Sequence, residues 1–371
     1  RPPNILLTTP ESLSLLLSYP DSFAMFADLK TVVIDEIHAF ATGKRGDLLS
    51  LALARLERIA PGLRRVGLSA TIADADAYRA WLAPEGDAAR VTLVEGERGA
   101  DPDIAILLPE GAVPWAGHSG RYAVHQVMAE VAKNRTTIIF CNTRGLAELI
   151  FQELWKVNDL SLPIAIHHGS LDREARQRAE NAMAEGRLRA LVATSSLDLG
   201  LDWGDVDCVI QMGAPKGSSR LLQRIGRANH RLDEPSRALI VPGNRFEFLE
   251  ARAALDAVEA GERDADRFRP GALDVLAQHV MALACAAPFR EEDLLAEIRG
   301  AQPYRWIDAA LFARLLGFVR DGGYALKSYD RFRRLAPDGQ GGWRIAHPRL
   351  AAQHRLNAGI IVDALTLDVR F

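Results

Sequence analysis

The sequence predicts an α/β protein with two parallel-sheet domains, the first truncated at its N-terminal side, followed by a winged-helix domain. Over residues 1–242, short apolar runs of strand length alternate with helical patterns. Continuous apolar runs of this kind are typical of strands that helices cover on both faces. Beyond residue 242, helical segments precede two short strand-like pieces, which is the order of a winged helix.

The strand-like runs divide the first two thirds of the chain. Residues 1–95 contain NILLTT, TVVIDE and RVGLSA and form the first α/β segment. Residues 121–245 contain TTIIFCN, PIAIHH, RALVATS, DCVIQM and RALIVP and form the second. Residues 96–120 carry glycine, proline and charge without periodicity, so we predict a linker there.

The last third is predicted to be mainly helical. Helical patterns cover residues 246–260, 273–284, 291–298 and 309–320, and the strand-like pieces YALKSY and GWRIAH follow them. We therefore predict a helical and winged-helix domain over 246–350. The run GIIVDALTLDVRF indicates the start of a β-rich domain over 351–371.

Composition excludes several classes of protein. The chain has 371 residues and a formal net charge of -3, which excludes a globally basic nucleic-acid coat but leaves room for local basic strips. Its three isolated cysteines lack CxxC spacing, which argues against a disulfide framework or a zinc site and favours a reducing cytoplasm. No apolar run reaches the roughly 18 residues of a membrane span. Because the chain lacks an initiator methionine, we expect an internal fragment.

Two adjacent carboxylates, Asp35 and Glu36, follow the apolar run Thr31–Ile34. At the carboxyl end of a parallel strand, one carboxylate can hold Mg²⁺ through water and a second can activate the water that attacks a γ-phosphate. A solvated acidic turn explains the same letters, so the pair alone leaves both interpretations open. Ser69 and Thr71 follow the next apolar run, and their hydroxyls could hydrogen-bond His38 across adjacent strand ends.

Further polar residues follow the predicted strands of the second segment. The run VATSSLDLGLD places Thr194, Ser195, Gly200 and Asp202 after a strand, and QRIGRANHR places several arginines on or near a helix. Such an arginine cluster is either a solvated helix face or a group that stabilises phosphate charge. The pair His167 and His168 should point to opposite faces of a strand, so we expect a structural or backbone-contact role and no metal site.

Taken in order, DEIH, SAT, IIFCNTR, HHGSL, VATSSLDLGLD and QRIGRA resemble the motifs of superfamily 2 DEAD/DEAH-box-type helicases. The finer wording, TTPESL, VVIDEIHAFATGKRG, QRIGRANH and WRIAHPRLAAQHRLNAGIIVDA, resembles the large helicase-related (Lhr) family over essentially the whole chain. The resemblance implies that both sheet domains are RecA-like, with the helicase ATP-binding domain first and the helicase C-terminal domain second.

The resemblance also implies roles toward ATP and Mg²⁺. Asp35 would coordinate Mg²⁺, Glu36 would activate water, and His38 with Ser69 and Thr71 would couple the nucleotide state to the strand track. The residues implied on the nucleotide side of the second segment are Gly200 and Asp202 near the ribose, Gln223 near the γ-phosphate and Arg227 as the arginine finger. Many relatives have a second arginine where this sequence has His230 and then Arg231, and which of these two reaches phosphate stays open.

The nucleic-acid track is implied at other residues. Thr9 can cap a helix that has Pro10 at its first position, and its free N–H groups suit a phosphate, although an ordinary helix cap explains the same letters. By resemblance, the residues that would grip the sugar-phosphate backbone of one strand are Thr8, Thr9, Arg144, Thr194 and Ser195. Such contacts position a strand without reading its sequence.

The sequence contains no GxxxxGK(S/T) phosphate loop. The nearest match, Thr42-Gly43-Lys44-Arg45, has arginine where serine or threonine belongs and follows the acidic strand, so we do not expect it to bind phosphate. Because the loop precedes DEIH in relatives, we expect that it was lost by truncation before Arg1 and that the fragment alone does not hydrolyse ATP.

The implied function is an ATP-dependent DNA helicase or translocase that moves 3′-to-5′ on single-stranded DNA in DNA repair, with ATP and Mg²⁺ as cofactors and no membrane partner. Two alternatives stay open. The first is an RNA or RNA:DNA-hybrid helicase with the same motor, because backbone contacts distinguish the two sugars poorly when contacts to the 2′-OH are unseen. The second is a non-catalytic nucleic-acid-binding module, which would require that the phosphate loop is missing in nature.

Overall fold

The computed structural model describes residues 3–69, 72–96, 100–108, 112–117, 119–197, 206–228, 235–264, 267–323, 326, 329 and 332–359. The chain divides into two compact units. Unit 1 combines Arg1–Ser69, Asp74–Val94 and Asp266–Phe371, and unit 2 combines Ala70–Ala73 and Glu95–Ala265. In sequence, unit 2 is therefore an insertion within unit 1.

Unit 2 contains a six-stranded sheet in the order β3-β8-β7-β4-β6-β5, in which every strand pair is parallel. The strands are β3 (Asp103–Ile106), β4 (Thr137–Cys141), β5 (Ile164–His167), β6 (Ala190–Ala193), β7 (Cys208–Met212) and β8 (Arg237–Val241). The sheet confirms the predicted parallel α/β fold. Strand β3 lies in the stretch predicted to be a linker, and its half-buried DIAI sequence suits the edge position beside β8.

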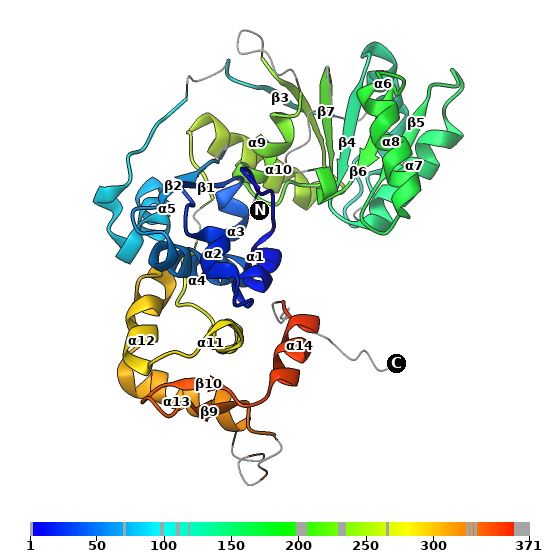
Figure 1. Cartoon of the computed structure of the whole chain (residues 1–371). Coiled ribbons are helices and arrows are strands. Elements are labelled where there is room, and N and C mark those ends of the chain that lie inside the picture. Colours follow the sequence, from blue (N-terminus) through cyan, green and yellow to red (C-terminus); the bar gives the residue numbers. More distant parts are fainter. Residues whose placement is uncertain are drawn as a thin grey trace. The chain divides into compact units, whose positions relative to one another are not determined.

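Helices cover both faces of this sheet (Figure 1). They are α6 (Val124–Lys133), α7 (Arg144–Lys156), α8 (Arg173–Ala184), α9 (Ser218–Ile225) and α10 (Arg245–Glu259), with short 3₁₀ turns η3 (Arg121–Ala123) and η4 (Ser195–Leu197). Alternate residues of β4 point to opposite faces: Ile138 and Phe140 pack with residues of α8, α9 and α10, whereas Ile139 and Cys141 pack with residues of α6 and α7. Both faces are buried, which explains why the strands read as continuous apolar runs.

The N-terminal part of unit 1 contains a two-stranded parallel sheet, β1 (Thr31–Ile34) and β2 (Arg64–Gly67). The helices of this part are α1 (Pro10–Leu17), α2 (Ser22–Phe26), α3 (Ile37–Phe40), α4 (Lys44–Ile59) and α5 (Ala75–Leu82), with η1 (Pro84–Gly86) and η2 (Ala88–Arg90). The predicted strand NILLTT is wrong: residues 3–9 form no strand, and Ile5 and Leu7 are exposed. A strand needs a ladder partner, and the described part of this sheet pairs β1 with β2 alone.

The C-terminal part of unit 1 contains the predicted winged helix. Its elements are α11 (Leu273–Ala286), α12 (Glu291–Arg299), η5 (Gln302–Tyr304), α13 (Ala309–Asp321), β9 (Leu335–Pro337), β10 (Trp343–Ile345) and α14 (Pro348–Leu356). The strands pair antiparallel. The first described strand of the hairpin begins at Leu335, and the Asp338 carboxylate accepts hydrogen bonds from the backbone N–H groups of Gln340 and Gly342, which fixes the turn between the two strands. The predicted strand-like piece YALKSY lies largely outside the described residues. Residues 360–371, predicted to begin a β-rich domain, lie outside the described residues.

Helix α4 shares one hydrophobic core with the winged-helix part of unit 1. Leu48, Leu51 and Ala54 of α4 belong to the same buried cluster as Leu276 of α11 and Phe312 of α13. Helix α4 also contacts α1, α2 and α3. Helix α4 therefore packs against the winged-helix part on one side and against α1, α2 and α3 on another, which explains why most of its sixteen residues are buried.

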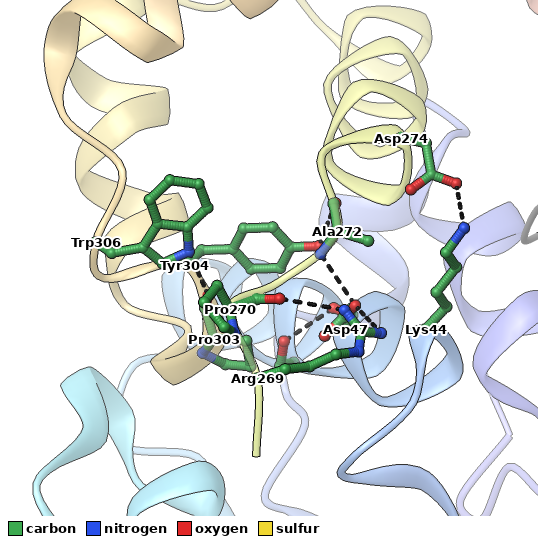
Figure 2. Close-up of polar contacts among 10 residues, drawn as sticks. Lys44, Asp47, Arg269, Pro270, Ala272, Asp274, Pro303, Tyr304 and Trp306 are labelled. Carbon is green, nitrogen blue, oxygen red and sulfur yellow. Dashed lines mark hydrogen bonds and ion pairs between the residues drawn. The ribbon is translucent and has the colours of Figure 1, made fainter. Parts of the chain in front are cut away.

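Polar contacts join the first turn of α4 to the chain that enters α11 (Figure 2). The buried carboxylate of Asp47 accepts hydrogen bonds from Arg269 Nη2 at 2.9 Å and from the backbone of Ala272 at 3.1 Å. Tyr304 donates to the carbonyl of Ala272 at 2.9 Å, and Lys44 Nζ lies 3.0 Å from Asp274. Burial raises the pKa of the Asp47 carboxyl, and the Ala272 hydrogen bond and the Arg269 charge oppose that rise.

A second buried ion pair lies further along α4. Arg55 Nη1 donates to Glu297 of α12 at 2.9 Å, and the Arg55 guanidinium also covers the ring of Phe23. The helix is thus bonded to the winged-helix part near both of its ends. In the described part of the chain, no helix is long and apolar enough to cross a membrane.

Candidate functional site

The acidic motif lies at the carboxyl end of β1. The buried Ile34 ends the strand, the exposed Asp35 follows, and Asp35 Oδ1 accepts a hydrogen bond from the backbone N–H of Glu36 at 2.9 Å. Glu36 has a left-handed backbone, with φ 50° and ψ 45°, which is rare for a residue with a side chain. Helix α3 then begins at Ile37, whose N–H donates to the carbonyl of Leu68 beyond β2. Strained backbone of this kind is common at functional sites.

His38 connects the ends of β1 and β2. Its Nδ1 lies 2.8 Å from Ser69 Oγ and 3.5 Å from Glu36 Oε2. The contact between His38 and Ser69 is the hydrogen bond expected between the ends of two adjacent strands. The structure therefore brings Glu36, His38 and Ser69 together, while Thr71 lies outside the described residues.

Helix α4 supports this motif from behind. A Cβ atom on Gly46 would lie 2.2 Å from the carbonyl oxygen of Phe40, the last residue of α3, so only glycine fits there. The two cations of the phosphate-loop match are engaged elsewhere: Lys44 pairs with Asp274, and Arg45 forms a bidentate pair with Glu11. The hydrogen bond from Arg45 is the main cause that lowers the pKa of Glu11.

The donor set at the end of β1 fits Mg²⁺. Mg²⁺ usually keeps several waters and binds one or two carboxylates together with phosphate oxygens, so one exposed carboxylate suffices. Asp35 is exposed, and its Oδ1 accepts a hydrogen bond from the backbone N–H of Glu36. Among those residues, no three His, Cys, Asp or Glu side chains converge on one point, so a metal held by protein ligands alone is not indicated there.

A second group of candidate residues lies at the carboxyl edge of the unit 2 sheet. Arg144 follows β4, and its guanidinium is hydrogen-bonded to the hydroxyl of Ser170, which follows β5. The buried Thr194 and the exposed Ser195 follow β6, and Thr194 N donates to the carbonyl of His167. Because β4, β6 and β5 are neighbours, these side chains gather at one edge.

The remaining residues that are predicted to contact a nucleic-acid strand lie in unit 1. Thr9 caps α1 by accepting a hydrogen bond from the backbone N–H of Ser12 at 3.2 Å, with Pro10 as the first helical residue. Both Thr8 and Thr9 are exposed. The capping interpretation is therefore confirmed, and the exposed hydroxyls remain accessible to a ligand.

Helix α9 divides the predicted arginine cluster. Gln223 and Arg227 are half-buried near its C-terminal end, whereas Arg224 is 1% exposed. Arg224 Nη1 donates to Gln211 Oε1 at 2.6 Å and to Asn142 Oδ1 at 3.4 Å. Sequence reasoning missed Asn142 and Gln211, because neither belongs to a motif with an obvious chemical role. Gly200, Asp202, His230 and Arg231 lie outside the described residues.

The two adjacent histidines have separate partners. His167 Nε2 lies 2.9 Å from Glu180 of α8, and His168 Nε2 lies 3.4 Å from Glu148 of α7. Both imidazoles are buried. Since the two glutamates belong to helices on opposite faces of the sheet, the histidines point apart as predicted.

Three protein-family models match the chain in succession. The "DEAD/DEAH box helicase" model matches residues 1–79, the "Helicase conserved C-terminal domain" model matches residues 121–231, and the "Large helicase-related protein, winged helix domain" model matches residues 256–371. This order is the order of domains that the sequence motifs predict.

Curated relatives carry related names. The chain is 32% identical over 369 residues to "ATP-dependent helicase Lhr-Core" of Methanocaldococcus jannaschii, with 100% of this chain and 43% of that protein covered. It is 33% identical over 380 residues to "Lhr helicase/uracil glycosylase" of Escherichia coli, with 90% of this chain and 24% of that protein covered. The chain therefore spans less than half the length of these relatives.

Two solved structures resemble the described fold. The structure of Mycobacterium smegmatis helicase Lhr bound to ssDNA and AMP-PNP gives a TM-score of 0.85 at 31% identity and covers 98% of this chain and 47% of its own. The DUF1998 helicase MrfA bound to DNA gives a TM-score of 0.72 at 21% identity, with 93% and 46% covered, which supports the fold alone. The motifs, the parallel α/β fold, the winged helix and these matches agree. The chain belongs to the large helicase-related (Lhr) family of DEAD/DEAH-box-type helicases.

Proposed function

We propose that this chain is part of an ATP-dependent DNA helicase that moves 3′-to-5′ along single-stranded DNA and acts in DNA repair. The observation that carries the proposal is the arrangement of Glu36, His38 and Ser69 at the ends of β1 and β2. The left-handed backbone at Glu36 and the hydrogen bond between His38 and Ser69 fix the acidic side chain next to an imidazole. Such a fixed carboxylate can orient and deprotonate an attacking water.

The nucleotide side of the proposal assigns one role to each residue. Asp35 would hold Mg²⁺, which would supply positive charge to offset the negative charge of the phosphates. Glu36 takes the proton of the attacking water. Gln223 contacts the γ-phosphate and Arg227 stabilises its developing charge, because a guanidinium matches phosphate geometry.

Residues outside the described part complete the proposed nucleotide side. Gly200 and Asp202 contact the ribose, and His230 or Arg231 adds a second contact to phosphate. Thr71 acts with Ser69 and His38 to couple the nucleotide state to the strand. The relative from M. smegmatis, whose structure is titled as bound to AMP-PNP, supports a nucleotide as ligand.

The nucleic-acid side uses polar groups of both units. Thr8 and Thr9 at the start of α1, together with Arg144, Thr194 and Ser195 at the sheet edge of unit 2, contact the sugar-phosphate backbone of one strand. Each lies at a helix start or a strand end, where backbone N–H groups also suit phosphate. The M. smegmatis relative is titled as bound to ssDNA, which supports single-stranded DNA as the tracked strand.

ATP hydrolysis by the whole protein tests the proposal. We expect single-stranded DNA to stimulate it, and Glu36→Gln and Arg227→Ala each to reduce the stimulated rate by at least about 100-fold. Single-stranded DNA binding should change by less than about threefold, because neither residue is assigned to the strand. Unaltered turnover in both variants would contradict the assignment.

Unwinding assays test the substrate and the direction. Duplexes with a 3′ or a 5′ single-stranded tail should be separated only from the 3′ tail. Duplexes that differ only in whether the tracked strand is DNA or RNA distinguish the DNA helicase from an RNA helicase, and a preference for an RNA track would favour the latter.

A further inference from the structure

We propose that Asn142, Gln211 and Arg224 form a positioning network in unit 2 that couples strand contact at Arg144 to the nucleotide-side residues of α9. The inference rests on the proposed function, and it assigns the coupling to three buried or half-buried side chains that have no proposed contact with the nucleotide or the strand. Its basis is the position of these residues between two groups of candidate site residues.

The network lies where two neighbouring strands end. β4 and β7 are adjacent and parallel, with Phe140 opposite Gln211 and Cys141 opposite Met212. Asn142 follows β4 directly, and Gln211 is the penultimate residue of β7. The strand-contact candidates follow β4, β6 and β5, whereas β7 leads to α9. The junction of β4 and β7 is therefore the border between the two groups.

Arg224 fixes α9 against this border. Its guanidinium is 1% exposed, donates to Gln211 Oε1 at 2.6 Å and to Asn142 Oδ1 at 3.4 Å, and lies 4.9 Å from the ring centroid of Phe140. In a buried site such hydrogen bonds are stronger than in water, and breaking them leaves a charge without solvent. Helix α9 therefore cannot turn or shift without disrupting the network.

Asn142 also holds the segment that leaves β7. Its Nδ2 donates to the carbonyl of Ala214 at 2.8 Å. Gln211 Nε2 donates to the carbonyls of Met212 at 3.0 Å and Gly213 at 3.2 Å. Gly213 has φ 80°, and a Cβ atom there would lie 3.3 Å from Asn142 Nδ2, so the backbone approaches this amide closely.

The use of amides follows from these contacts. An amide side chain accepts with its oxygen and donates with its nitrogen, so Gln211 and Asn142 can bind Arg224 and the backbone carbonyls at the same time. A carboxylate in either position could accept from Arg224 but would face the carbonyls of residues 212–214 without a donor. The chemistry thus favours a neutral bridge over an ion pair.

The other end of the network is the proposed strand contact. Asn142 directly precedes Thr143, which caps α7 by accepting from the backbone of Leu146 at 3.2 Å, and Arg144 is the first residue of that helix. A phosphate that draws Arg144 away from Ser170 moves the backbone next to Asn142. The shift reaches Arg224 through Asn142 and Gln211, and then Gln223 and Arg227, which flank Arg224 on α9 or just beyond its end.

The test uses the whole protein and compares the rate of ATP hydrolysis with and without single-stranded DNA. Arg224→Met removes the charge and keeps much of the volume, and Arg224→Lys keeps one donor for Gln211. The matched control is Glu130→Gln. Glu130 is buried, and its carboxylate accepts a hydrogen bond from Arg237 at 3.1 Å. Arg237 is the first residue of β8, so this contact lies at the amino end of the strand, away from the network.

We expect Arg224→Met to lower the ratio of DNA-stimulated to DNA-free rate by about tenfold, Arg224→Lys to restore part of the ratio, and Glu130→Gln to leave it unchanged. The dissociation constant for single-stranded DNA should change by less than about threefold in all three. Equal losses of both rates in Arg224→Met, or the same fall of the ratio in Glu130→Gln, would overturn the coupling role.

Thermal melting identifies variants that do not fold. If Arg224→Met fails to fold, Asn142→Ala gives the same measurement, because the Asn142 side chain is only half-buried. Its ratio should also fall, and an unchanged ratio would overturn the inference. A wild-type protein whose ATP hydrolysis does not respond to single-stranded DNA would instead contradict the proposed function itself.

Discussion

The carboxylate of Asp47 in α4 accepts a hydrogen bond of 2.9 Å from the guanidinium of Arg269, which lies 222 residues further along the chain (Figure 2). The same carboxylate oxygen accepts from the backbone of Ala272, where the chain enters α11. The contact joins the helix behind the DEIH motif to the winged-helix part of unit 1. A polar group buried at such a junction is costly to leave without its partner.

Asp47→Ala should destabilise unit 1 by about 1–3 kcal/mol, because the N–H of Ala272 loses its acceptor in a buried site. Asp274→Ala is the matched control: it removes the Lys44 pair, whose carboxylate is 31% exposed, and should cost less than about 1 kcal/mol. Urea unfolding at pH 7, followed by tryptophan fluorescence, measures both. Equal losses in the two variants would contradict the importance of burial.

Gly46→Ala should destabilise the packing of α3 on α4 by at least about 1–3 kcal/mol, because the new Cβ would lie 2.2 Å from the carbonyl oxygen of Phe40. Gly43→Ala is the control, since its Cβ would lie 3.7 Å from the same oxygen, an ordinary contact. Thermal melting of the two variants decides the matter. A Gly46→Ala protein as stable as Gly43→Ala would show that α3 can move away freely.

His279 in α11 should make unit 1 sensitive to acid. Burial, aided by the nearby Arg55 charge, lowers the pKa of this imidazole from 6.5 to about 3. Below pH 6.5 the unfolded chain takes up a proton that the folded chain refuses, so the free energy of unfolding falls with pH by up to about 1.4 kcal/mol per unit until the folded pKa is reached. Stability from this group is thus present above pH 6.5 and lost toward pH 3.

Comparison with His279→Leu isolates that contribution. Burial raises the pKa values of Asp47 and Glu297, so the stability that these two groups contribute is lost as pH rises. Both groups are present in wild type and in the variant, so their effect cancels in the comparison. The unfolding free energy of wild type minus that of His279→Leu should therefore decrease as the pH falls from 7 to 5. A constant difference over that range would show that folding does not shift the pKa of His279.

Ser69→Ala removes the hydroxyl that lies 2.8 Å from His38 Nδ1. In the whole protein we expect unwinding to fall about tenfold more than ATP hydrolysis, because the variant keeps Glu36 but loses the fixed imidazole between the two strand ends. Ser50→Ala is the control, since its buried hydroxyl donates to the carbonyl of Asp47 within the same helix. Parallel losses of unwinding and hydrolysis in Ser69→Ala would argue against a coupling role.

The parallel sheet could be predicted because its strands are buried on both faces. β4, for example, is buried at all five residues and reads as an uninterrupted apolar run. The hydrogen bond between His38 and Ser69 could also be expected, since parallel strands end at one edge of a sheet. The edge strand β3 escaped prediction because it is short and half-exposed, so its pattern resembles a loop.

The contacts that fix helices could not be predicted. Arg224 appears in the sequence as one member of an arginine cluster, and nothing in its neighbours shows that it is buried over Phe140. Asp47 likewise reads as an ordinary charge in the first turn of a helix. Their partners are distant in sequence, and the burial that gives these polar groups their importance arises only in the folded chain.

The insertion of unit 2 within unit 1 has a consequence for biosynthesis. The strands of unit 2 follow one another in sequence, so its sheet can form as soon as β8 has left the ribosome. Leu48, Leu51 and Ala54 of α4 emerge much earlier but wait for α11 and α13 before their core is complete. A nascent chain that stalls in between would carry a finished module attached to an exposed apolar helix, a form that chaperones bind and that tends to aggregate.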